Sequence, residues 1–107
     1  MKLIITIVSK DDSTALMAAL IKKKFFVTKL ASTGGFLRSG NVTLMIGTSD
    51  ELVDTAVDTI TEYSKSRKEL VPNTIANEFG PLTSIPFEVS VGGATMFIID
   101  VEKFIKV

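Results

Sequence analysis

Apolar residues near the start of the chain predict a β-strand in the middle of a sheet. The run Leu3–Val8 is short, rich in β-branched residues and bounded by polar positions, as buried strands are. Alternate residues would face opposite sides of the sheet, with Leu3, Ile5 and Ile7 on one side and Ile4, Thr6 and Val8 on the other. Because both sets are largely apolar, we expect this strand to be central and covered on both faces.

Apolar residues then recur at helical spacing in two segments. The first helix is expected to begin at Asp11, Asp12 and Ser13, whose side chains suit a helix start, and to end at Lys22–Lys24. In the second, Thr48 and Glu51 have the spacing of a capping box. Its apolar face continues to about Lys65 through Leu52, Val53, Ala56, Val57, Ile60 and Tyr63.

Four further segments have strand character: Phe25–Ser32, Val42–Thr48, Pro86–Val91 and Ala94–Val101. The order of elements predicts an α+β fold of the ferredoxin-like βαββαβ type, with a four-stranded antiparallel sheet and both helices on one face. In this interpretation Pro86–Val91 is the fourth strand of the sheet and Ala94–Val101 is an extra C-terminal strand.

The segment Ser66–Ile85 follows neither period. It contains Pro72, Gly80 and Pro81 among mixed polar and scattered apolar residues, which predicts a long flexible loop. Loops of this length inside a compact domain are commonly functional or disordered. We therefore expect residues 1–107 to form a single domain with one long loop at 66–85.

The composition indicates that the protein is an assembly rather than a monomer. Hydrophobic residues make up 46% of only 107 residues, whereas two helices can cover only one face of the predicted sheet. A second apolar face of several hundred Å² is rarely left exposed on a soluble monomer. The sequence therefore predicts a homo-oligomer whose subunits turn these faces toward one another.

Absent residue types exclude several kinds of site. The chain has no His and no Cys, so thiol nucleophiles, Ser-His-Asp triads, disulfides and ordinary zinc sites are excluded. The 12 Lys and Arg residues balance 12 Asp and Glu residues, which argues against broad binding to nucleic acid or to an anionic membrane. No segment is typical of a signal peptide or a membrane span. We expect a cytoplasmic protein without a metal site or cofactor.

Candidate binding chemistry is concentrated between Thr28 and Gly47. Closely spaced glycines at 34, 35 and 40 allow backbone N–H groups to converge on an anion, and Phe36 adds an apolar plane beside them. Neutral polar groups such as Thr28 and Asn41 complete a set that suits a nucleobase joined to phosphate. An ordinary glycine turn with a loop-anchoring phenylalanine explains the pattern equally well. Gly92–Gly93 is better explained as a turn or bulge between strands.

The chain resembles the PII-like cyclic di-AMP receptor proteins. The resemblance rests on five segments: Met1–Ile5 (MKLII), Val27–Asn41 (VTKLASTGGFLRSGN), Met45–Gly47 (MIG), Pro86–Val89 (PFEV) and Val91–Thr95 (VGGAT). It implies a homotrimer without enzymatic activity that binds cyclic di-AMP in the clefts between subunits. It also implies that the ligand signals to a downstream protein by reordering loops, here about Phe36–Asn41 and Ser66–Ile85.

Carried over residue by residue, the resemblance implies a ligand-binding set on this chain. Thr28 and Gly47 would lie near one adenine, and Asn41 would meet a phosphate. Gly35, Phe36 and Leu37 would line the loop that closes on the ligand, and Gly92 would allow close approach from the sheet.

This chain departs from the family pattern at Lys24–Phe26, because family members commonly have Asn-Phe-Arg there. Phe26 thus replaces an arginine that would favour an anionic ligand. Lys24, Lys29 or Arg38 could supply the charge, or Phe26 could stack on adenine. An alternative function is a PII-type regulator that senses ATP, ADP or another adenine nucleotide, although only two arginines are present for a polyphosphate. A small enzyme or an oxygen-ligated metal-binding oligomer is a third hypothesis.

Overall fold

The computed structural model describes residues 1–30, 40–71 and 87–107. The described elements, in chain order, are β1 (Lys2–Ser9), α1 (Lys10–Lys22), β2 (Phe26–Leu30), β3 (Asn41–Thr48), a 3-10 turn (Asp50–Leu52), α2 (Val53–Ser64), β4 (Arg67–Val71), β5 (Phe87–Val91) and β6 (Ala94–Asp100).

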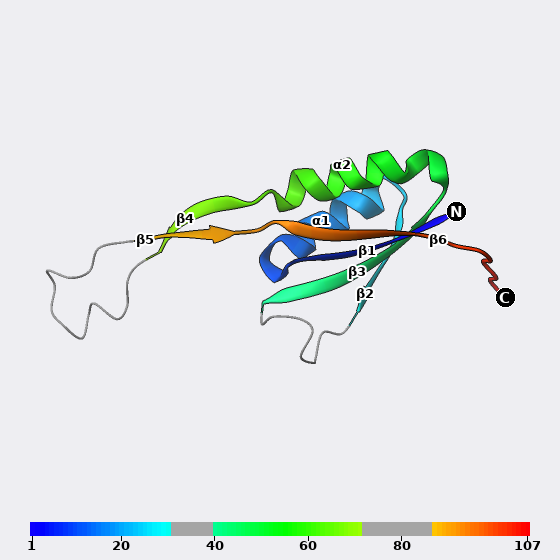
Figure 1. Ribbon diagram of the computed structural model, residues 1–107, viewed down its shortest axis with the longest axis horizontal. Helices are drawn as coiled ribbons and strands as arrows, with labels where there is room; N and C mark the ends of the chain where they lie inside the picture. The colour runs from blue at the N-terminus through cyan, green and yellow to red at the C-terminus, as the bar shows by residue number, and fades with distance from the viewer. Residues whose placement is uncertain (31–39, 72–86) are drawn as a thin grey trace, which may run out of the picture.

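Four strands form one antiparallel sheet in the order β2-β3-β1-β6, and both helices lie on the same side of it (Figure 1). This is a small α+β fold compatible with the predicted ferredoxin-like arrangement, and β1 is a central strand as expected. The predicted identity of the fourth strand is wrong. β6 fills that position by pairing with β1 from Lys2↔Asp100 to Val8↔Ala94, whereas β5 lies outside this sheet.

The segment expected to be a long loop contains a strand. β4 pairs with β5 in a separate two-stranded antiparallel sheet, with Arg67 opposite Val91 and Val71 opposite Phe87. This pair, named the arm here, projects from the end of the helical layer (Figure 1). The sequence of β4 lacks the apolar alternation of a half-buried strand because the described part of the arm has no helix packed over it. Residues 72–86, the rest of the predicted loop and Pro86 of the predicted strand, lie outside the described residues.

Polar contacts fix the base of the arm to the body. The guanidinium of Arg67 donates to both carboxylate oxygens of Asp12, at 3.0 and 3.3 Å. The Asp12 side chain is largely buried at the start of α1. Two residues beyond the end of β5, the backbone N–H of Gly93 donates to the carbonyl of Ser64 at the end of α2. Each strand of the arm is therefore tied to the helical layer at its root.

The two helix starts differ from those expected. Ser9 caps α1 by accepting a hydrogen bond from the Asp12 N–H, so the helix begins one residue before Asp11. Asp11 and Asp12 occupy the first turn, where acidic side chains complement the helix dipole. The capping box predicted at Thr48 and Glu51 is wrong. Ser49 precedes a 3-10 turn there without a side-chain capping bond, and Thr48 is the last, buried residue of β3.

The core lies between the sheet and the helices. Its fully buried members come from one face of each helix and from alternate positions of the two central strands: Ile4, Leu16, Leu20, Leu44, Ile46, Ala56 and Ile60. Thr6 belongs to the same layer and is also fully buried, yet its hydroxyl has no hydrogen-bond partner among the described residues. A buried polar group without a partner costs stability.

We expect Thr6→Val to stabilise the protein by about 1 kcal/mol, because it removes the unpartnered hydroxyl and keeps the branched shape. Thr59→Val is the matched control. Thr59 is equally buried, but its hydroxyl donates to the Thr55 carbonyl and accepts from Lys23 Nζ at 2.7 Å. The control should therefore lose about 1 kcal/mol. Chemical denaturation of both variants provides the test, and equal losses would contradict the assignment.

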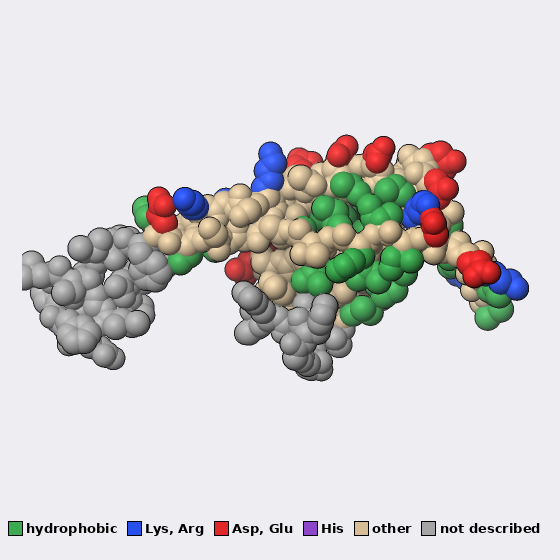
Figure 2. All heavy atoms as spheres, in the orientation of Figure 1, with side chains coloured by type: hydrophobic (Ala, Val, Ile, Leu, Met, Phe, Trp, Pro, Cys, Tyr) green, Lys and Arg blue, Asp and Glu red, His purple; other side chains and the backbone are tan. Residues whose placement is uncertain are grey.

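The side of the sheet that faces away from the helices, named the open face here, carries a continuous set of apolar side chains. Leu3, Ile5 and Ile7 of β1 are only half-buried there, so the described residues do not provide the predicted cover on this side of β1. At the β6 edge, Phe97 and Ile99 are about half exposed. Figure 2 shows hydrophobic side chains gathered on both sides of β6. Among the described residues, neither helix is long and apolar enough to cross a membrane.

Candidate functional site

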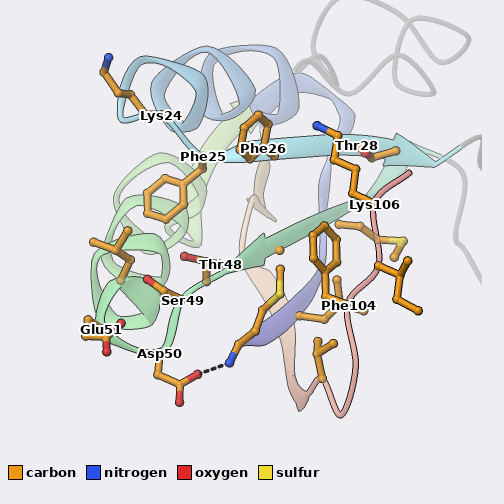
Figure 3. Close-up of a pocket in the computed structure, with 17 residues that line it drawn as sticks. Lys24, Phe25, Phe26, Thr28, Thr48, Ser49, Asp50, Glu51, Phe104 and Lys106 are labelled. Carbon is orange, nitrogen blue, oxygen red and sulfur yellow. Dashed lines mark ion pairs between the residues drawn. The ribbon is translucent and has the colours of Figure 1, made fainter.

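An open pocket of about 1070 Å³ lies at one end of the open face (Figure 3). Its floor is the sheet, because Thr28 of β2 is paired with Met45 of β3, and Phe26 is paired with Gly47. The residues after β6, here named the tail (Val101–Val107), form part of its wall. Small-molecule sites typically have volumes of roughly 300–1,000 Å³ and mostly apolar linings. The pocket is therefore large enough for a ligand of the size of a dinucleotide.

Two structural details keep the pocket floor open. Gly47 has no side chain, and a Cβ built there would lie 3.3 Å from the Met1 methyl group. Phe26 projects from the edge strand with 82% of its surface exposed. The floor thus offers a flat backbone surface beside an exposed aromatic ring and the hydroxyl-bearing Thr28, which suits a planar heterocycle with polar edges.

Charged groups are placed unevenly around the pocket. The Met1 ammonium lies 2.9 Å from Asp50 Oδ1, and the hydrogen bond it donates lowers the pKa of that carboxyl. These two charges compensate each other. Two lysines, Lys24 and Lys106, and one further carboxylate, Glu51, also line the pocket. The pocket as a whole therefore has a small positive excess, which favours an anionic ligand.

The predicted site residues do not all meet in one chain. Thr28 and Gly47 line the pocket. Asn41 opens β3 opposite Ser9, six residues from Gly47, which corresponds to about 20 Å along a strand. Gly92 lies at the same end as Asn41, at the root of the arm, with a φ of 80°. Gly35, Phe36 and Leu37 lie outside the described residues.

A comparison with protein-family models matches residues 1–107, the whole chain, to the family described as cyclic-di-AMP receptor. The chain belongs to the cyclic-di-AMP receptor family. This result confirms the family resemblance found in the sequence.

A solved structure is similar to this receptor-family member in both sequence and fold. It is the crystal structure of a functionally unknown protein from Pediococcus pentosaceus ATCC 25745, at 36% identity and a TM-score of 0.78. The match covers 99% of this chain and 96% of the other. The fold described for this receptor-family member is thus shared along nearly the full length of a chain of similar size.

The predicted ligand-binding set did not include the tail, which forms part of the receptor's pocket. Val101, Phe104, Ile105 and Lys106 all line the pocket, and the Val101 N–H donates to the Met1 carbonyl at 3.1 Å. The signal was present, because Phe104 and Ile105 are large apolar residues flanked by Lys103 and Lys106. Their return onto the sheet depends on β6 lying beside β1, which the predicted strand order did not include.

Proposed function

We propose that the protein is a signal transduction protein that binds cyclic di-AMP between the subunits of a homotrimer. Binding would then be relayed to a downstream protein by rearrangement of loops, without a catalytic step. The family match over the whole chain is the observation that carries this proposal. The pocket supports it, because Thr28 and Gly47, two residues expected at an adenine, line the same cavity.

The expected ligand-binding residues lie at two different ends of the sheet, which supports a site between subunits. Thr28 and Gly47 lie at the pocket, whereas Asn41 and Gly92 lie toward the opposite end of the sheet. A ligand with two adenines and two phosphodiesters can contact both sets only if a neighbouring subunit brings the second set to the pocket. The exposed apolar open face provides a reason for such subunits to associate.

Calorimetric titration with cyclic di-AMP, ATP and AMP tests this function. We expect the protein to bind cyclic di-AMP and to bind it more tightly than the other two. Thr28→Val should weaken binding about tenfold by removing one hydrogen-bonding hydroxyl while keeping a β-branched strand residue. Thr61→Val is the control, because Thr61 is an exposed threonine of α2, on the opposite side of the sheet from the open face and outside the pocket lining. Tighter binding of ATP would instead favour the PII-type nucleotide regulator.

A further inference from the structure

The pocket holds one cation whose position is defined by an aromatic ring. Lys106 Nζ lies 5.9 Å from the centre of the Phe26 ring, within the range of a cation–π contact. Both side chains line the pocket, and they come from opposite parts of the chain, the tail and β2 (Figure 3). None of the ion pairs among the described residues includes Lys106. Its charge is therefore not compensated by a carboxylate there.

The other positive groups near the pocket are less suited to meet a ligand. The Met1 ammonium is paired with Asp50, and Lys2 is paired with Asp100 outside the pocket lining. Lys24 lies in the turn between α1 and β2, and no cation–π contact among the described residues holds its ammonium in place. By contrast, Lys106 has an ammonium group positioned over the open face, where the sheet floor is exposed.

An exposed ring and an uncompensated ammonium complement the two chemical parts of a nucleotide. An aromatic ring offers a stacking surface to a base, and such stacking tolerates any base because each has a π-face. An ammonium on a flexible four-carbon stem acts as a mobile point charge for a phosphate oxygen. Because the ring and the ammonium are in contact, a single mononucleotide unit spans both.

We propose that Phe26 and Lys106 together form a nucleotide-recognition pair, in which the ring stacks on an adenine and the ammonium moves to the adjoining phosphodiester. This inference rests on the proposed function and adds a determinant of affinity to the same pocket. The base takes the ring surface that the cation occupies without ligand, so binding exchanges a cation–π contact for base stacking and a charged hydrogen bond. The contact between Lys106 and the phosphodiester thereby fixes the tail against the bound ligand.

Calorimetric titration of the full chain with cyclic di-AMP at low and high NaCl tests the pair. Lys106→Met keeps the length of the side chain and removes its charge, so affinity should fall about tenfold at low salt. The salt dependence of binding should become weaker at the same time, because one charge contact is lost. Lys106→Arg should retain binding, and Phe26→Leu should weaken it while preserving the salt dependence.

Lys103→Met is the matched control, since Lys103 belongs to the same tail but does not line the pocket. Unchanged affinity and salt dependence in Lys106→Met would overturn the pair and leave the proposed function intact. An equal loss in Lys103→Met would also overturn it, because the effect would then come from the overall charge of the tail. Absence of cyclic di-AMP binding by the unaltered protein would overturn both proposals.

Discussion

Replacing Gly92 with alanine is expected to lower the stability of the protein more than the same change at Gly93. Gly92 has a φ of 80°, and Gly93 has a φ of 86°, so both occupy the left-handed region that disfavours residues with a Cβ. This conformational cost is about 1–2 kcal/mol at either position. Only at Gly92 would the new Cβ also meet backbone, because it would lie 2.7 Å from the Lys65 carbonyl oxygen and from Arg67 Nη1.

Gly93→Ala is therefore the matched control, since the nearest atom to its new Cβ is 4.0 Å away. We expect Gly92→Ala to cost at least twice as much in chemical denaturation as the control. Relief of the clash must move Arg67, so the ion pair with Asp12 should open and the amides of the arm should exchange faster with solvent. Equal costs at the two glycines would show that the root of the arm accommodates a side chain at position 92.

The second large effect is expected at the open face. Phe97 lies opposite Ile5 on β1 and is 49% exposed. If the homotrimer forms through this face, Phe97→Lys places an ammonium group in the interface, where an unpaired charge is strongly unfavourable. The variant should therefore become monomeric and lose cyclic di-AMP binding together with assembly. Its helical content should persist, because Phe97 points away from the core.

Ile21→Lys is the control for this substitution. Ile21 is an apolar residue of similar exposure, 57%, but it lies on α1 rather than on the sheet. The control should keep the mass of the unaltered protein in light scattering coupled to size-exclusion chromatography. If Phe97→Lys also keeps that mass, assembly does not use this face.

The sequence was sufficient to predict both helices and three strands of the sheet, β1, β2 and β3. Period-2 alternation placed Ile4 and Val8 on one side of β1, and helical spacing placed Ala56 and Ile60 on one face of α2. All four are core residues. These positions are determined by local pattern, since one side of each element must be apolar. Thr28 and Gly47, which come to line one pocket, were predicted through the family resemblance rather than through periodicity.

The parts that were predicted incorrectly depend on pairing over long distances. The strand at Arg67–Val71 begins with three consecutive charged residues, because its stability comes from pairing with β5 rather than from a core. The strand order could not be read from pattern either, since β5 and β6 have similar composition and only one can pair with β1. The position of the tail depends on the same pairing, because β6 beside β1 brings Val101 next to Met1.

One strand joins the two regions that the proposed function requires. β6 begins directly after Gly93 at the root of the arm and ends at Asp100, one residue before the tail enters the pocket. Along its whole length it is hydrogen-bonded to β1, and its seven residues span about 23 Å. The wall of the pocket and the base of the arm thus lie at the two ends of one strand that is paired with β1 throughout. A displacement of the tail along β6 would reach the arm through Gly92 and Gly93, the two residues that connect β5 to β6.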